Sequence, residues 1–538
     1  MKAIFTIFCR VCLLLLIPFM LGCQPEEAPK GNDSSNQNNN NDNSDNGNDN
    51  DGSGNSGTNA VVETYQYPVF QSYPDGVTDA DNVIKPDSKY RVTVEGEEQF
   101  VLKTGTPKSK IRTVSSGSFA GADKAVDEPR LCAFGCVGTV KVEISLKDGT
   151  IGSYEVSPVS KEPAHSLTDG KIVLNMRPYD RYVIKINNDE QNLLFVFANP
   201  FQQQMGVDLS DPNVKVLKAG NVYKGAYVLN SGETLFIEGG AILFGHVMIE
   251  NKTNCHVDGP GIVYCSPEFN YIGVDLYRST DCSVKNGIVL NKSAWGTRFS
   301  ESNRITVDNW KSISTCNPYD PNGVNNDSCD IFGSSNVTLT RGFSYSHDDA
   351  ICIKSQKFQF KGVVENVTYD DYVTYAYDGG NGMDLGYELN QNVSNITYKN
   401  IYVIRSNGTR DEMRRGGLAL HNAAAGAVTN VKYENIYIED PREFGFHMAI
   451  LKSNYEIGIE NGQSIYWTKP GTVNDVTVKN LHILKTPPYG YYISGYDDSH
   501  KFNVTFDGLY ICGKKISSLS EFDKIANTTI RYANVTIK

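Results

Sequence analysis

The chain has no excess of positive charge. Its 62 acidic and 50 basic residues give a net charge of −12 at pH 7 and a pI near 5.3. Nucleic-acid binding needs basic patches that neutralise phosphates, so we expect no nucleic-acid partner. The 12 cysteines and 8 histidines form no Cys/His cluster with the spacing of a zinc site. We therefore expect neither a metal nor a cofactor.

The apolar run at the N-terminus is too interrupted to span a membrane. It extends over Ala3–Leu21, is broken by Arg10 and is followed by Gly22 and Cys23. A membrane span needs about 20 apolar residues, so a secretory signal is favoured over a span. A cysteine directly after a small residue resembles the lipobox of bacterial lipoproteins. The resemblance implies a signal peptide over residues 1–22 and lipidation of Cys23. Gln24-Pro25-Glu26-Glu27 resembles the acidic export signals of surface lipoproteins in some Gram-negative bacteria, which implies an anchor to the outer membrane or cell surface of such a cell.

Residues 23–60 are predicted to be a disordered tether. Gly31–Ala60 consists almost entirely of Asn, Asp, Gly and Ser and has no aromatic or branched apolar residue. Such a segment cannot bury enough surface to offset the entropy lost on ordering. The tether would let the following body reach away from a membrane.

Few cysteines have an obvious partner. Three of the 12 lie in the leader, which leaves nine, an odd number for a protein outside the cytoplasm. Cys132 and Cys136 are close enough in sequence for a small disulfide loop. Cys329 and Cys352 are separated by about one coil of the repeat described below, and we expect a buried stack rather than a bridge.

Residues 61–206 are predicted to be a β-sandwich. Segments such as Tyr90–Val94, Val140–Ile144 and Tyr182–Ile186 alternate apolar and polar residues with turn residues between them. This period-two pattern at short spacing is typical of antiparallel sandwiches. The domain carries no constellation of site residues, and we expect it to cap the end of the next domain rather than to bind sugar.

Residues 207–538 are repetitive and predict a parallel β-helix. Each repeat opens with Asn or Asp, continues with alternating apolar residues and reaches a second turn residue, which describes one rung of such a helix. The fold class is therefore all-β, a right-handed single-stranded parallel β-helix preceded by a sandwich. The repeats include Asn336–Leu339, Asn366–Tyr369, Asn395–Tyr398, Asn430–Tyr433, Asp475–Val478 and Asn503–Phe506.

Three acids in this repeat region carry the chemical signal. Asp327 is 21 residues before Asp348, and Asp349 follows directly. This step is close to one coil, so the carboxylates are expected on adjacent coils, which stack about 4.8 Å apart. Three acids on one face are what an enzyme needs to protonate a glycosidic oxygen and activate a water. The residues indicate a polysaccharide hydrolase acting on a polysaccharide or oligosaccharide substrate.

Residues 216 to 510 resemble a known family of β-helix enzymes. Asn325–Asp330 and Asp348–Ser355 are similar to the Asn-Thr-Asp-Gly-x-Asp and Asp-Asp motifs of the polygalacturonases of glycoside hydrolase family 28. Ser293-Ala294-Trp295 resembles the family's Ser-Pro-x-Trp segment. A sandwich before the helix resembles the dextranases and isopullulanases of family 49. The resemblance implies an inverting mechanism, with Asp348 as general acid and with Asp327 and Asp349 holding and deprotonating the water.

Two departures from the family pattern leave the substrate open. Asn381 stands where family 28 has the His of Gly-His-Gly, and Ala419-Leu420-His421 stands where it has Arg-Ile-Lys. The second change removes the cations that would hold a galacturonate carboxylate. Arg414 and Arg415 lie nearby as possible replacements. A neutral α-glucan or a decorated glycan is therefore as plausible as pectin.

Other side chains are expected to line the cleft and bind substrate. Trp295 is a candidate aromatic platform for a sugar ring, and His347 is adjacent to the acid pair. Tyr387 and Glu388 are further candidates in the same region. The predicted substrate-binding residues are Asn325, His347, Asn381, Lys354, His421, Trp295 and Asp384.

Two alternatives from other classes remain open. A polysaccharide lyase on the same fold would need calcium held by acids and an Arg or Lys base, and no Arg lies in an obvious motif beside the acids. A non-catalytic glycan-binding lipoprotein would not need the acid trio. We expect a monomer, and the sequence does not distinguish attack at chain ends from attack within the chain.

Overall fold

The computed structural model describes most of the chain after residue 60. Residues Val61–Lys538 form one compact unit. No helix in the described part is long and apolar enough to cross a membrane. The predicted signal peptide, Cys23 and the tether lie outside the described residues, which are 61–68, 84–103, 111–113, 123–125, 127–265, 271–291, 295–315, 326–357, 360–377, 379–407, 415–452, 456–460 and 463–538.

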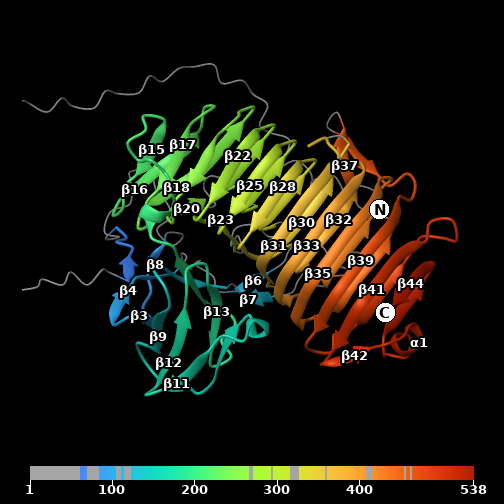
Figure 1. Cartoon of the computed structure of the whole chain (residues 1–538), viewed down its shortest axis with the longest axis horizontal. Coiled ribbons are helices and arrows are strands. Elements are labelled where there is room, and N and C mark those ends of the chain that lie inside the picture. The colour runs from blue at the N-terminus through green and yellow to red at the C-terminus, as the bar shows by residue number, and fades with distance from the viewer. Residues whose placement is uncertain are drawn as a thin grey trace, which may run out of the picture. The chain divides into compact units, whose positions relative to one another are not determined.

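Most of this unit is a parallel β-helix, as predicted, in which 28 strands form one continuous sheet. Successive coils stack in register and give three parallel ladders, seen as the inclined strands of Figure 1. Ladder 1 contains β15 (Val214–Leu217), β17 (Thr234–Ile237), β19 (His256–Asp258), β22 (Thr280–Lys285), β25 (Asn303–Asp308), β28 (Ser335–Thr340), β31 (Val364–Ala376), β33 (Val393–Ser406), β35 (Ala427–Pro441), β39 (Thr472–Ile483), β41 (Phe502–Ile511) and β44 (Ala533–Ile537).

The other two ladders form the remaining faces of the coils. Ladder 2 contains β16 (Val222–Val228), β18 (Ile242–Glu250), β20 (Ile262–Cys265), β23 (Ile288–Asn291), β26 (Lys311–Ser314) and β29 (Phe343–Ser346), and it continues into the second half of β31. Ladder 3 starts from the end of β18 and contains β21 (Val274–Tyr277), β24 (Thr297–Ser300), β27 (Cys329–Phe332), β30 (Ile351–Ser355), β32 (Met383–Leu389), β34 (Gly416–Asn422), β36 (Phe444–Ile450), β40 (Gly490–Ser494) and β43 (Thr528–Arg531).

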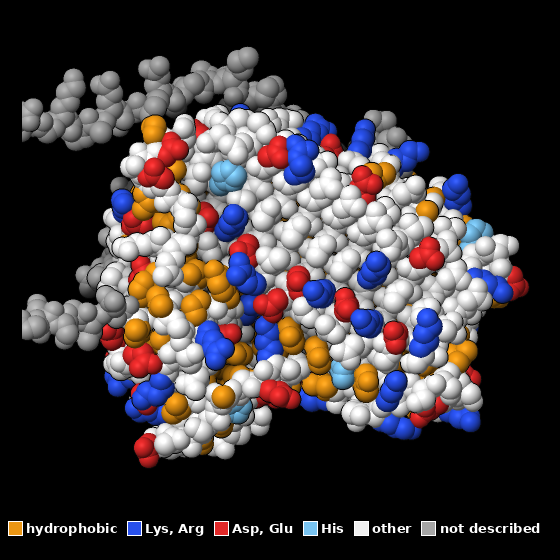
Figure 2. Space-filling model, in the orientation of Figure 1, with side chains coloured by type: hydrophobic (Ala, Val, Ile, Leu, Met, Phe, Trp, Pro, Cys, Tyr) orange, Lys and Arg blue, Asp and Glu red, His pale blue; other side chains and the backbone are white. Residues whose placement is uncertain are grey.

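Alternation along each strand separates the inside of the helix from the outside. Inward residues such as Ile331, Ile353 and Leu385 join one continuous apolar core. Outward residues of ladder 1 are polar, and Figure 2 shows acidic and basic side chains interleaved on this face. Asp370, Lys399, Glu434 and Lys479 are register partners on four successive strands.

Asparagines mark the bends of the coils, which confirms the predicted role of the repeat's opening residue. Asn366, Asn395 and Asn430 have φ values of 58°, 58° and 52°, in the left-handed region that Asn tolerates better than most residues. Their amides form a ladder: Asn395 Nδ2 donates to Asn366 Oδ1 at 3.1 Å, and Asn430 Nδ2 donates to Asn395 Oδ1 at 2.6 Å.

The N-terminal part contains two sheets that share one apolar core. One sheet has the order β10 (Tyr154–Ser157), β13 (Arg181–Ile186), β14 (Leu194–Asn199), β8 (Arg130–Cys136), β5 (Val101–Lys103) and β2 (Lys85–Pro86), with β1 (Val62–Thr64) on β8. The other has the order β11 (His165–Thr168), β12 (Lys171–Met176), β9 (Val140–Leu146), β3 (Tyr90–Val94) and β4 (Glu97–Gln99). The pairing is antiparallel except between β8 and β14, which run parallel.

This part packs against the side of the β-helix, so the expectation that it caps the helix end is wrong. Phe195 of β14 lies 5.2 Å from Phe343 and 5.1 Å from Tyr345 of β29, measured between ring centroids. Arg181 Nε donates to the carbonyl of Gly342 at 2.8 Å. The N-terminal part packs here because the outward residues of ladder 2 are apolar and are buried by this contact.

The possible disulfide between Cys132 and Cys136 does not form, and Cys329 and Cys352 are buried and unbridged as expected but do not stack on each other. Cys132 and Cys136 are free and lie four residues apart on β8. A strand rises about 3.3 Å per residue, so their Cα atoms are far beyond disulfide reach. Cys329 pairs in register with Ile351 rather than with Cys352. The two thiols therefore point to opposite faces of ladder 3, one into the core and one outward.

Candidate active site

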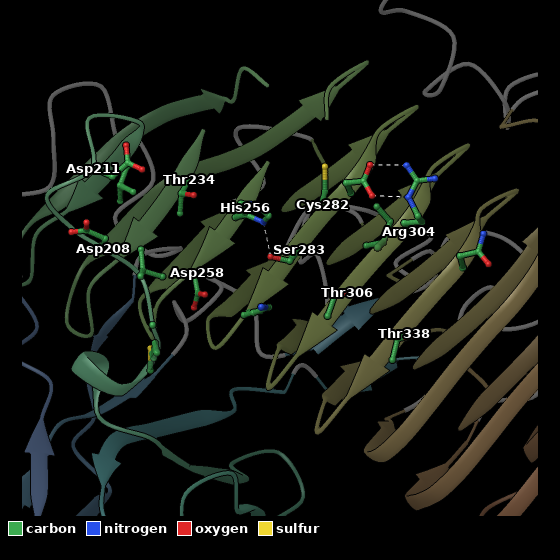
Figure 3. A pocket seen from close by; sticks show the side chains of 18 residues that line it. Asp208, Asp211, Thr234, His256, Asp258, Cys282, Ser283, Arg304, Thr306 and Thr338 are labelled. Atoms are coloured by element: carbon green, nitrogen blue, oxygen red, sulfur yellow. Dashed lines mark hydrogen bonds and ion pairs between the residues drawn. The ribbon is translucent and has the colours of Figure 1, made fainter. Parts of the chain in front are cut away.

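A pocket of about 680 Å³ opens on ladder 1, away from the acid trio (Figure 3). Register partners on successive strands form its floor, and His256 Nδ1 lies 2.8 Å from Ser283 Oγ. Asp281 and Arg304 form an ion pair at its wall. None of the three acids lines this pocket, because they lie on ladder 3. The candidate site is therefore the group of residues around the acid trio.

The three acids lie at the starts of two neighbouring strands of ladder 3, as predicted. Asp327 is two residues before β27, and Asp348 and Asp349 directly precede Ala350 and β30. Cys329 of β27 pairs with Ile351 of β30, so continuing the register places Asp349, not Asp348, beside Asp327. All three carboxyls are buried, with 2–5% of each residue exposed.

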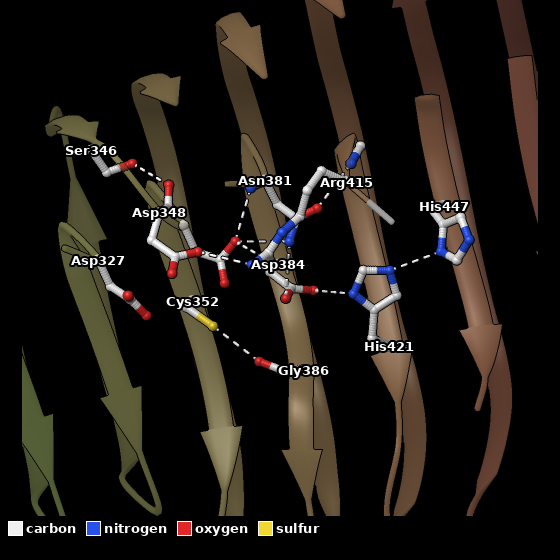
Figure 4. Close-up of polar contacts among 12 residues, drawn as sticks. Asp327, Ser346, Asp348, Cys352, Asn381, Asp384, Gly386, Arg415, His421 and His447 are labelled. Atoms are coloured by element: carbon white, nitrogen blue, oxygen red, sulfur yellow. Dashed lines mark hydrogen bonds and ion pairs between the residues drawn. The ribbon is translucent and has the colours of Figure 1, made fainter. Parts of the chain in front are cut away.

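Arg415 binds two of these acids. It precedes β34, two coils beyond the acid pair, and its side chain reaches back across β32 (Figure 4). Nη1 donates to Asp349 Oδ1 at 2.9 Å and Nη2 donates to Asp348 Oδ1 at 3.0 Å. Burial opposes the charge of Arg415, but Asp349 and Asp348 raise its pKa above the usual range. The guanidinium therefore stays charged in the site.

The intervening coil passes very close to the acid pair. A Cβ atom on Gly380 would lie 1.8 Å from the carbonyl oxygen of Asp348 and 2.4 Å from the amide nitrogen of Asp349. A side chain at this position would push the acid-bearing turn away. Gly380 is therefore required by the close approach of two backbones.

Asn381 anchors Asp349. Its backbone nitrogen and its Nδ2 both donate to Asp349 Oδ1 at 2.8 Å, and its own Oδ1 accepts from Gly416 N at 2.9 Å. Burial opposes ionisation of Asp349, but Arg415, Lys354 and the two bonds from Asn381 together hold its pKa below the usual value. Asp349 is thus ionised well into the acidic range.

Lys354 binds the third acid next to an aromatic stack. Its Nζ donates to Asp327 Oδ2 at 3.0 Å. Burial lowers the pKa of this amine, but the charge of Asp327 outweighs burial and raises it well above the usual value. Nζ also lies 5.5 Å from the ring centroid of Trp295, which stacks on Phe332 with centroids 5.3 Å apart. The predicted aromatic residue therefore lies beside the acid trio.

A row of polar side chains leads from the acids across the next coils. Asn381 Nδ2 donates to Asp384 Oδ2 at 3.3 Å, and Asp384 Oδ1 lies 3.5 Å from His421 Nδ1. His421 Nε2 lies 2.9 Å from Nδ1 of His447 (Figure 4). The ring of His447 stacks on that of Tyr492. Asp384 and His421, predicted to meet the sugar directly, are buried in this row.

His347 lies with the N-terminal part of the chain. Its Nε2 is 2.8 Å from Asp127 Oδ1, and Tyr345 OH donates to the other oxygen of Asp127 at 2.7 Å. Only 1% of His347 is exposed. Its imidazole therefore has almost no surface for a sugar in this structure, although its backbone carries the turn to Asp348.

The remaining predicted residues fall into two groups. Asn325, Arg414, Ser293 and Ala294 lie outside the described residues. Tyr387 makes an edge contact with the ring of His421 at 6.3 Å between centroids. Burial raises the pKa of Glu388, and Lys354 acts against this shift.

One group of possible metal ligands occurs in the site. Ligand atoms of Asp349, Cys352 and Asp384 lie within 4.8 Å of one another. Burial raises the pKa of the Cys352 thiol well above its usual value, and Sγ donates to the carbonyl of Gly386 at 3.0 Å. Calcium takes six to eight oxygen ligands. The Cys352 thiol is not an oxygen ligand, and the Asp349 carboxylate is already bound to Arg415, so this group does not suit calcium.

Sequence reasoning missed several site residues. His447 and Tyr492 were not identified because their place opposite His421 depends on coil lengths that the sequence does not fix. Asp127 comes from the N-terminal part, 220 residues before His347. Arg415, by contrast, was named from the sequence as a possible replacement cation, since a basic pair occurs just before a strand of the repeat.

Comparisons with known proteins agree with the motifs. The family model described as Glycosyl hydrolases family 28 matches residues 242–530. Probable endopolygalacturonase D of Aspergillus flavus is 24% identical over 334 residues, which cover 57% of this chain and 62% of that protein. This chain therefore spans less than two thirds of the length of that relative.

Two solved structures are also similar. An exopolygalacturonase from Thermotoga maritima has a TM-score of 0.45 and 14% identity, over 60% of this chain and 83% of that chain. Dex49A from Penicillium minioluteum has a TM-score of 0.43 and 13% identity, over 88% of this chain and 96% of that chain. Since the family model covers more than half of the 538 residues, this protein belongs to family 28 of the glycosyl hydrolases.

Proposed function

We propose that this enzyme hydrolyses O-glycosidic bonds of a polysaccharide in a single inverting displacement. The observation that carries the proposal is the division of two cations among three acids. Lys354 contacts Asp327, and Arg415 contacts Asp348 and Asp349. Cations favour the ionised form of nearby carboxylates. Two cations offset only two of three negative charges, so the site can hold two ionised carboxylates beside one protonated acid, as general acid and base catalysis requires.

In the proposed step one water attacks the anomeric carbon. The bond from this carbon to the leaving-group oxygen breaks, and that oxygen takes the proton of Asp348. The proton of the water passes to Asp349, with Asp327 holding the water in line. Inversion follows because a single displacement from the opposite face makes the new C–O bond.

The hydrogen bonds favour this assignment of roles. Two nitrogens of Asn381 and one of Arg415 donate to Asp349 Oδ1, which leaves Oδ2 to take the water proton. Arg415 donates to Oδ1 of Asp348, so we assign the proton of Asp348 to its other oxygen. The lowered pKa of Asp349 makes it the base of the pair.

The charges in the site favour a neutral glycan over a galacturonan. Among the described residues around the trio, both cations are already bound to carboxylates, and Asp384 adds a further acid. The bond between His421 and His447 requires one ring to accept, so this pair carries at most one positive charge. A uronate carboxylate here would meet net negative charge. The enzyme is thus closer to a dextranase than to a polygalacturonase in the sugar it takes.

A substrate panel with product analysis tests this function. Dextran, pullulan and polygalacturonate are incubated with the enzyme, new reducing ends are counted, and proton NMR records the first anomer formed. We expect a neutral glycan to be cleaved with inversion. Faster cleavage of polygalacturonate would refute the neutral substrate and leave the hydrolase standing. Unsaturated products that absorb ultraviolet light would indicate a lyase, and binding without new reducing ends would refute catalysis.

We also propose that the enzyme acts outside the cytoplasm, anchored through a lipid on Cys23. The support is the signal-like segment ending at Gly22-Cys23 and the polar segment that follows. Cys23→Ser expressed in a Gram-negative host is expected to move the protein from the membrane fraction to the soluble fraction. Equal membrane content of the variant and the parent would contradict the anchor.

A further inference from the structure

Asp330 is a fourth carboxyl beside the trio. It lies on β27, three residues after Asp327, on the outward face of ladder 3, and it is completely buried. The charge of Asp327, three residues earlier in the chain, acts directly on the Asp330 carboxyl. Yet both oxygens of Asp330 and Oδ1 of Asp327 lack a hydrogen-bond donor within the described structure.

Two ionised carboxylates in this position would not be stable. Buried polar atoms without a hydrogen-bond partner are destabilising, and more so when they are charged. Like charges in contact disfavour ionisation of one of the two groups. Lys354 donates to Oδ2 of Asp327, so Oδ1 of Asp327 still lacks a donor in the described part of the chain. One proton between the carboxyls removes the repulsion and gives Oδ1 of Asp327 a donor.

The surrounding charges decide which carboxyl holds the proton. Asp327, Lys354 and Asp349 are the charged groups that act on Asp330. Arg298, the register partner of Asp330 on β24, is bound in two places by Asp275, and Cys352 is the partner on β30. Burial, followed by the charge of Asp327, raises the pKa of Asp330 well above its usual value. Lys354 Nζ contacts Asp327 Oδ2 at 3.0 Å, whereas neither oxygen of Asp330 has a donor among the described residues.

We propose that Asp330 carries a proton at neutral pH and donates it in a hydrogen bond to Asp327 Oδ1, as a positioning residue. Asp327 is then held from both sides, by Lys354 at Oδ2 and by a neutral donor at Oδ1. The proton is not transferred during the reaction. The positioning role rests on the function proposed above for Asp327, whereas the protonation of Asp330 does not depend on it.

Two substitutions at position 330 distinguish a need for a hydrogen-bond donor from a need for a negative charge. Asp330→Asn places an amide N–H where the carboxyl O–H was, so kcat is expected to stay within about threefold of the parent. Asp330→Leu has similar size and no donor, and kcat is expected to fall about 10- to 100-fold with little change in KM, since loss of positioning has effects of that order. A large loss in Asp330→Asn would show that an ionised Asp330 is needed. Full activity in Asp330→Leu would refute the positioning role.

A second measurement needs no substrate. The folded protein keeps the proton of Asp330 at neutral pH, whereas the unfolded chain releases it, so this group makes the parent less stable as pH rises. Asp330→Asn removes this dependence. The Tm of the variant is therefore expected to exceed that of the parent by a margin that grows between pH 5 and pH 8.

The two readouts separate the possible failures. A Tm difference that stays constant from pH 5 to pH 8 would refute the protonation of Asp330. A parent enzyme that cleaves no glycan would instead refute the proposed function, and the Tm comparison would still decide the protonation.

Discussion

Asp348→Asn and Asp327→Asn are each expected to lower kcat by roughly 10²- to 10⁴-fold, the range that general acid or base groups contribute. Asparagine at 348 cannot give a proton to the leaving oxygen. At 327 it removes the charge that orients the attacking water and leaves Lys354 without its partner. The measurement is reducing-end release on the glycan that the parent cleaves fastest, with initial rates over a range of concentrations.

Asp507→Asn is the matched control. Asp507 is an exposed acid on β41, distant in the chain from the trio, and the same chemical change there should leave kcat unaltered. Far-ultraviolet circular dichroism and Tm would show that the active-site variants still fold. Full activity in both Asp348→Asn and Asp327→Asn would refute the proposed mechanism.

The sequence was sufficient to predict the β-helix and the place of the trio, because both depend on local patterns. The asparagines at the bends are predictable because each one adopts a left-handed backbone conformation by itself. The alternation of apolar and polar residues then determines which side chains face the core. The residue step between Asp327 and the Asp348-Asp349 pair then places the acids on neighbouring strands. The step alone suggested that Asp348 stacks on Asp327, whereas the register places Asp349 there.

Some contacts between distant segments could not be predicted from the sequence. Arg415 reaches the acids across an intervening coil, and the length of that coil is set by insertions that follow no pattern.

The packing of the N-terminal part against the side of the β-helix, in contrast, is indicated by the sequence. Segments such as Ile242–Phe244 and Ile262–Tyr264 are apolar without alternation, which is typical of strands buried on both faces. The outward Phe244 and Tyr264 lie in the apolar cluster shared with the N-terminal part.

The Asp127–His347 contact explains why the N-terminal part matters to the site. Asp127 binds the side chain of His347, which directly precedes Asp348 in the chain. Phe195, also in the N-terminal part, packs on Tyr345. The turn that carries the acid pair is therefore held from outside the β-helix. These contacts come from residues outside the repeat, so the repeat pattern does not indicate them.

Arg415→Met is expected to lower stability more than any other single substitution in the site, and to lower activity as well. It removes the cation shared by Asp348 and Asp349 while leaving their burial unchanged. Removing one partner of a buried ion pair costs about 3–5 kcal/mol. Urea unfolding at pH 7.5 would measure the loss. Arg304→Gln breaks an exposed ion pair with Asp281 and should leave stability within experimental error.

The pH dependence of Arg415→Met distinguishes an electrostatic effect from a packing effect. In the parent, the lowered pKa of Asp349 adds stability above the pKa of the unfolded chain, and this stability is lost as pH falls through the folded pKa. Without Arg415, burial raises the pKa of Asp349, so the variant is penalised most at neutral pH. The stability gap to the parent should therefore narrow between pH 7.5 and pH 4.5, and the acidic limb of residual activity should move to higher pH. An equal gap at both pH values would mean that Arg415 acts by filling space and not by holding the acids ionised.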